Sequence, residues 1–155
     1  MLESPPYITH VEARQTAVVR LDIPRSEMQS MMRPAIDELM SVLKAQGVQA
    51  AGPLFSRHFA MHADTFDFEV GVPVSVPVAP AGRVAASTLP ATRVARAVFK
   101  GDYSGLAKGW SGFLDWIAAH RFQTRPDMWE VYLSGPAANP DPSSWRTEFN
   151  KPLLD

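Results

Sequence analysis

The chain has 155 residues, 46% of them apolar and 20% charged, which is typical of one soluble globular domain rather than a disordered segment. Its formal net charge of −1 gives no basis for a nucleic-acid partner, because such proteins carry a basic patch. It contains no cysteine, which excludes disulfides and thiol catalysis. The N-terminus is not a secretory signal, and no apolar run reaches the roughly 20 residues that span a bilayer, so we expect a cytoplasmic protein without a membrane partner.

The first half of the chain is predicted to form a strand, a helix and two further strands. Alternating apolar positions indicate the strands, and an apolar stripe of helical period indicates the helix. We place Pro34 at the start of this helix, because proline disrupts a helix interior, and Gly47 at its end. The elements cover about residues 12–23, 34–46, 53–61 and 65–74.

The second half is predicted to repeat this order after a linker at 75–83, whose prolines keep it extended. Its first strand is interrupted near Pro90, and Asp102 and Ser104 lie in the cap region of its helix. The elements cover about residues 85–100, 104–121, 128–133 and 146–153.

An internal duplication accounts for the repeated order. Phe66–Val74 matches Trp145–Leu153 in an aromatic residue, a glutamate three positions later, and a proline near the end. The helices agree at a shift of 78, which places Met32 of the first half on Trp110 of the second. Two similar halves predict packing about a pseudo-twofold axis, and the seam between them is a natural place for a small-molecule site.

We therefore predict a single α+β domain over residues 1–155, built from duplicated β-α-β-β units at about 8–74 and 84–154. The expected architecture is an antiparallel sheet with two helices on one face.

The strand Trp129–Leu133 carries the most informative acid of the sequence. Period-two alternation places Glu130 and Tyr132 on one face of this strand. A carboxylate within a short apolar strand needs a partner or a function, because an unpaired buried charge is costly. An exposed face, or a salt bridge to Arg57 or Arg146, would also explain it, and the sequence leaves these alternatives open.

Aromatic residues are dense in the second half, and most of them, Phe113 and Trp129 in particular, are expected in the core. Buried tyrosine and tryptophan also need polar partners. A pocket that joins such rings to one acid suits flat, lipophilic or cationic ligands. Trp110 is of special interest, because the flexible Met32 at its counterpart position suggests that one half is specialised.

Metal and cofactor sites are not indicated. His58 and His62 are four residues apart, but they flank the end of a predicted strand and do not share a helical face. The sequence also has no glycine-rich phosphate loop.

Together with the duplication, the turn Gly101–Leu106 and the strands Trp129–Leu133 and Trp145–Phe149 give a chain that resembles the gyrase-inhibitor-like (GyrI-like) small-molecule-binding domain. That family also forms the effector-binding part of AraC-type and MerR-type transcription regulators. The resemblance covers about residues 8–154 and implies a ligand groove between the two halves, lined by aromatic residues around a central acid. The chain departs from the regulators in having no helix-turn-helix segment, so we do not expect direct nucleic-acid binding.

The resemblance places the family's acid on Glu130, the aromatic residue that follows it on Tyr132, the helix-start tyrosine on Tyr103 and the mid-helix aromatic on Trp110. We add Phe149 and Phe55 as candidate walls of the ligand site.

From these residues we predict a stand-alone binding protein for small lipophilic or aromatic compounds, cations among them. One alternative is a hydrolase of reactive lipophilic compounds, in which Glu130 is catalytic and acts on water. Another is a protein-interaction module that modulates gyrase. The sequence leaves open the ligand, the presence of turnover, and whether the protein is a monomer or a dimer.

Overall fold

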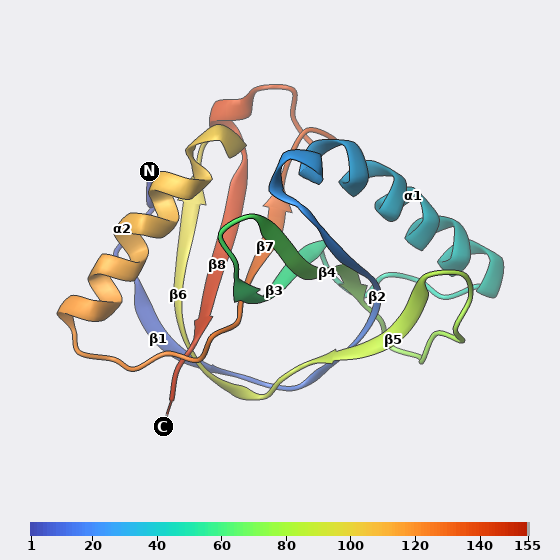
Figure 1. Cartoon of the computed structure of the whole chain (residues 1–155), viewed down its shortest axis with the longest axis horizontal. Coiled ribbons are helices and arrows are strands. Elements are labelled where there is room, and N and C mark those ends of the chain that lie inside the picture. The colour runs from blue at the N-terminus through green and yellow to red at the C-terminus, as the bar shows by residue number, and fades with distance from the viewer. Residues whose placement is uncertain (155) are drawn as a thin grey trace. The chain divides into compact units, whose positions relative to one another are not determined.

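The computed structural model describes residues 1–154, which form two compact units (Figure 1). The unit Glu12–Ala91 is called the N-unit below. The C-unit combines Met1–Val11 with Thr92–Asp155. Each unit is an antiparallel sheet covered on one face by a helix, which confirms the α+β class.

In the N-unit, the strands lie in the order β3-β4-β2-β5 and are all antiparallel to their neighbours. The helix α1 packs on β2 and β4 through Ala35, Leu39 and Leu43, which form one core with the inward side chains of those strands. The elements are β2 (Arg14–Pro24), η1 (Arg25–Glu27), α1 (Met28–Gln46), β3 (Phe55–Met61), β4 (Thr65–Pro73) and β5 (Val84–Leu89).

In the C-unit, the strands lie in the order β7-β8-β6-β1 and are again antiparallel. The helix α2 buries Trp110, Phe113 and Ile117 against this sheet, and Asp102 caps the preceding turn by accepting a hydrogen bond from Ser104 N at 2.8 Å. The elements are β1 (Tyr7–Val11), β6 (Thr92–Lys100), η2 (Tyr103–Gly105), α2 (Leu106–Ala119), β7 (Met128–Ser134), η3 (Pro142–Ser144) and β8 (Arg146–Pro152).

The duplication is visible in the strand pairing as well as in the order of elements. Glu69 of β4 lies opposite Arg57, and Glu148 of β8 lies opposite Val131. The register then shifts two to three residues further along both strands, between His58 and Ala60 in β3 and between Tyr132 and Ser134 in β7. A bulge at the same position in both units indicates two copies of one structural unit.

The two outermost strands pair in a way that the sequence did not predict. β1 is a strand of its own that pairs with β6. The interruption predicted near Pro90 is confirmed, and it separates β5, which pairs with β2, from β6. Each therefore adds a fourth strand to its sheet by pairing with a strand that is distant in sequence. The repeat is better described as β-β-α-β-β, with the first strand of each copy contributed to the other unit.

Pro34 lies inside α1, so its predicted place at the helix start is wrong. The helix begins at Met28, and Met28, Met31 and Met32 pack partly buried against the N-unit core. Burial of these side chains offsets the loss of one backbone hydrogen bond at the proline. Gly47 ends the helix as expected, in the left-handed conformation with φ of 68°. Neither α1 nor α2, the helices of the described residues, is long and apolar enough to span a membrane.

Candidate functional site

The register of β7 directs Glu130 toward the helix side of the C-unit sheet. Glu130 lies opposite Phe149 on β8, and Phe149 belongs to the core that includes Phe113 of α2. Trp129 lies opposite Asn150 on the other face. The alternation predicted from the sequence therefore holds, and it points the acid at the helix.

The carboxylate of Glu130 is buried and is hydrogen-bonded through both oxygens. Trp110 Nε1 donates to Oε1 at 2.6 Å, and the Tyr132 hydroxyl donates to Oε2 at 3.0 Å. Glu130 is 8% exposed, so it does not lie on a solvated face. The guanidinium of Arg146 pairs instead with Glu3, at 2.9 Å.

Burial raises the pKa of Glu130, and the hydrogen bonds from Trp110 and Tyr132 oppose that rise. Both donors are neutral groups. The carboxylate oxygens therefore accept hydrogen bonds, but neither donor carries a positive charge that would balance the carboxylate. This arrangement favours the binding of a cation or the uptake of a proton.

A stack of aromatic rings fixes the indole that binds this carboxylate. Phe149 is fully buried, and its ring stacks on Trp110 at 4.5 Å and on Phe99 at 5.9 Å between centroids. Gly109 allows the close approach of α2, because a Cβ at this position would lie 2.7 Å from Phe99 Cδ1. Packing in the core therefore determines where the N–H of Trp110 points.

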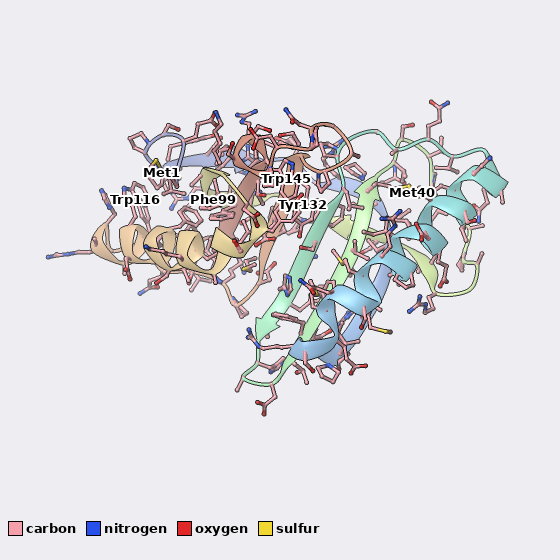
Figure 2. The ribbon with its side chains drawn as sticks, turned by 90° about the horizontal axis from the view of Figure 1, so that it is seen from above. Met1, Met40, Phe99, Trp116, Tyr132 and Trp145 are labelled. Atoms are coloured by element: carbon pink, nitrogen blue, oxygen red, sulfur yellow. The ribbon has the colours of Figure 1, made fainter. Side chains whose placement is uncertain are left out.

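Partly exposed aromatic residues lie near the acid. The ring of Tyr103 is 5.9 Å from that of Tyr132 and 4.8 Å from that of Trp145. Burial, followed by the charge of Glu130, raises the pKa of Tyr103. Trp145 Nε1 donates to Asn139 O at 2.8 Å, which ties its ring to the proline-rich loop before β8. Tyr132 and Trp145 are labelled in Figure 2.

These residues are called the Glu130 cluster below. The cluster consists of Tyr103, Trp110, Glu130, Tyr132, Trp145 and Phe149.

Five of the six candidate ligand-binding residues from the sequence lie in this cluster. Phe55, the sixth, belongs to the N-unit, where it is buried on β3 opposite Gly71. Trp145 was not among the candidates, because the sequence presents it only as the first residue of a repeated strand. Its position next to a proline-rich loop, in a region where tyrosine and tryptophan are frequent, is the signal that could have identified it.

The two closely spaced histidines, His58 and His62, differ in burial. His58 is buried in β3, whereas His62 follows the strand and is exposed. Across residues 1–154, no group of three or more His, Asp or Glu side chains is placed to hold a metal ion.

Comparison with known protein families identifies the class of protein to which this arrangement belongs. Residues 4–152 match the GyrI-like small molecule binding domain, a span that includes nearly the whole chain. The chain therefore belongs to the GyrI-like family, and its role is the binding of small molecules.

Solved structures share the fold at low sequence identity. The EcmrR C-terminal domain has a TM-score of 0.86 and 17% identity, over 97% of this chain and 98% of that domain. In the EcmrR–DNA complex the match covers 97% of this chain but 57% of the EcmrR chain, with a TM-score of 0.85 and 18% identity. This chain therefore spans little more than half of full EcmrR.

Two further structures are similar along most of their length. SAV2435 bound to tetraphenylphosphonium has a TM-score of 0.71 and 8% identity, over 97% of this chain and 94% of SAV2435. A hydrolase encoded by lin2189 from Listeria innocua has a TM-score of 0.68 and 11% identity, over 96% and 91% of the two chains. No curated protein sequence matches the chain.

Proposed function

We propose that this chain binds small lipophilic aromatic compounds, preferentially cations, at the Glu130 cluster. The observation that carries the proposal is the buried carboxylate of Glu130, whose two hydrogen bonds come from the neutral donors Trp110 and Tyr132. A bound cation would supply the missing counter-charge, and its attraction to a carboxylate increases where water is excluded.

The rings of the cluster determine which cations suit the site. Tyr103, Tyr132 and Trp145 are partly exposed, so their rings are available to a ligand that approaches Glu130. Aromatic faces attract cations by cation–π interaction. A small inorganic ion is strongly hydrated, and aromatic rings cannot compensate for the hydration that it would lose on binding. A lipophilic cation with a delocalised or shielded charge therefore fits best. Tetraphenylphosphonium, the ligand present in the SAV2435 structure, is a suitable probe.

The substitution Glu130→Gln tests the role of the charge, because glutamine preserves the shape of the side chain. We expect tetraphenylphosphonium to bind the variant about 5- to 30-fold more weakly than wild type, equivalent to a loss of about 1–2 kcal/mol for a partly desolvated charge contact. Isothermal titration calorimetry at neutral pH would measure both affinities.

Glu148→Gln provides a matched control for that comparison. Glu148 lies on β8 and pairs with Arg96 at 3.4 Å, so the same chemical change occurs outside the Glu130 cluster. We expect its affinity to stay within about twofold of wild type, as is usual for substitutions away from a site. Equal affinities for wild type and Glu130→Gln would contradict a site that recognises charge.

Hydrolysis of a reactive lipophilic compound is the second candidate function, favoured by the raised pKa of Glu130 next to a tyrosine hydroxyl. A carboxylate acts as a general base most effectively when its pKa is close to the working pH. Glu130 would accept a proton from water while the water oxygen attacks the electrophilic carbon, the bond from that carbon to the leaving group would break, and protonated Glu130 would return the proton to the leaving group. Product formation that is sustained in wild type and absent in Glu130→Gln, detected by mass spectrometry, would assign this function in place of simple binding.

A further inference from the structure

The duplication assigns a counterpart in the N-unit to each residue around Glu130. Arg57 and Val131 occupy equivalent positions, because each lies opposite the repeated glutamate and precedes the repeated bulge. The next residue of each strand is His58 in β3 and Tyr132 in β7. His58 therefore occupies the place from which Tyr132 donates its hydroxyl to the acid.

His58 is enclosed by aromatic rings but lacks the hydrogen bond that such burial requires. It is 6% exposed, its ring stacks on Phe68 at 4.9 Å, and it meets the edge of Phe66 at 5.3 Å. Its Nδ1 atom is buried and has no hydrogen-bond partner among the described residues. Nearly all buried polar side-chain atoms have such a partner, so an unpaired ring nitrogen indicates a place for a group that the protein does not supply.

The charges around His58 determine which kind of ligand could pair with its Nδ1 atom. The Arg25 guanidinium lies 4.4 Å from the centroid of Phe66. Burial, with a smaller effect from the charge of Arg25, lowers the pKa of His58 to about 4, so the ring is neutral at neutral pH. The charge of Asp67 acts on His58 in the opposite direction and offsets part of the Arg25 charge, so the neutral ring suits an uncharged ligand rather than an ion.

Flexible side chains also pack on the same N-unit core that contains Phe68. Met28, Met31 and Met32 are partly buried against it, and Met32 is the counterpart of Trp110. Methionine is unbranched and polarisable, so it can rearrange around ligands of different shape. At the positions of Tyr132 and Trp110 in the C-unit, the N-unit therefore has a polar ring nitrogen and an adaptable apolar side chain.

We propose that His58 is the polar contact of a second ligand site, within the N-unit, that takes uncharged aromatic compounds bearing a hydroxyl group. A hydroxyl both donates and accepts hydrogen bonds, so it pairs with Nδ1 in either tautomer of a neutral imidazole. Phe66, which is partly exposed, provides a ring against which the aromatic part of the compound stacks. This inference rests on the N-unit alone and goes beyond the function proposed for the Glu130 cluster.

The pair 2-naphthol and naphthalene tests the site, since the two compounds differ by one hydroxyl. We expect His58→Phe, which retains an aromatic ring but removes the nitrogen, to bind 2-naphthol about tenfold more weakly than wild type, the effect of losing one hydrogen bond. Binding of naphthalene should change by less than about twofold, because its contacts are with carbon atoms. Ligand fluorescence at neutral pH would report both affinities. The exposed His62 supplies the matched control, and His62→Phe should bind both compounds as wild type does.

Nitrogen-15 NMR of the histidine rings gives a direct readout that does not depend on the folding of a variant. Addition of 2-naphthol to wild type should shift the ring-nitrogen signals of His58, whereas naphthalene should leave them near their free positions. The proposal is overturned if 2-naphthol does not bind, if it binds without moving these signals, or if His58→Phe binds it as tightly as wild type. None of these outcomes depends on whether tetraphenylphosphonium binds, so the two sites are tested separately.

Discussion

Replacing Phe149 with alanine is expected to lower the free energy of unfolding by about 3–5 kcal/mol, the usual cost of removing a fully buried phenyl ring. Phe149 is 0% exposed and its ring lies against Phe99, Trp110 and Phe113, so truncation leaves a cavity at the centre of the C-unit core. Urea unfolding followed by tryptophan fluorescence would measure the loss. All four tryptophans lie in the C-unit, so the signal reports on the affected core.

Leu114→Ala is the control for this prediction. Leu114 is on α2 but is 42% exposed, and its truncation should change stability by no more than about 0.5 kcal/mol. The Phe149 variant should also bind tetraphenylphosphonium more weakly, because Trp110 loses the ring that orients its indole toward Glu130. A loss of less than about 1 kcal/mol for Phe149→Ala would show that the stack is not a main source of C-unit stability.

Acidification is expected to destabilise the protein through His58. Burial lowers the pKa of His58 from 6.5 to about 4, the positive charge of Arg25 adds to this, and Asp67 acts in the opposite direction. The unfolded chain therefore takes up a proton on this histidine at a higher pH than the folded chain does. The stability that the neutral ring contributes is complete above about pH 6.5 and is lost as the pH falls toward 4. At about 1.4 kcal/mol for each pH unit, the full loss is about 3 kcal/mol.

His58→Phe should remove this part of the pH dependence, since phenylalanine does not titrate. We expect the stability difference between pH 7 and pH 4, measured by urea unfolding with circular dichroism, to be about 3 kcal/mol smaller in the variant than in wild type. His62→Phe, a change at an exposed histidine, should behave as wild type. Parallel pH profiles for wild type and His58→Phe would mean that His58 titrates at the same pH in the folded and unfolded states.

The parts of the fold that the sequence predicted depend on local pattern. Alternation along Trp129–Leu133 was enough to place Glu130 and Tyr132 on one face, and helical spacing placed Trp110 on the buried side of α2. Side-chain direction in a strand or helix follows from backbone geometry, so a few neighbouring residues determine it.

The parts that were not predicted depend on distant partners. Tyr7–Val11 forms an edge strand only because it pairs with β6, more than 80 residues further along the chain. Trp145 joins the Glu130 cluster because Asn139, within a proline-rich loop, accepts a hydrogen bond from its indole. The interior position of Pro34 reflects the burial of three methionines in the turns before it. Neither strand pairing nor loop path is encoded in the period of a short segment.

The number of protons released when tetraphenylphosphonium binds tests the central claim most directly. Burial raises the pKa of free Glu130, and a cation bound against the carboxylate would lower it again. At a pH between the two values, binding to wild type should therefore release up to about one proton, and the release should vanish in Glu130→Gln. Calorimetric titration in buffers of different ionisation enthalpy measures this number. Proton release that is the same in wild type and Glu130→Gln would contradict the account, because the cation would then be bound without contact with the Glu130 charge.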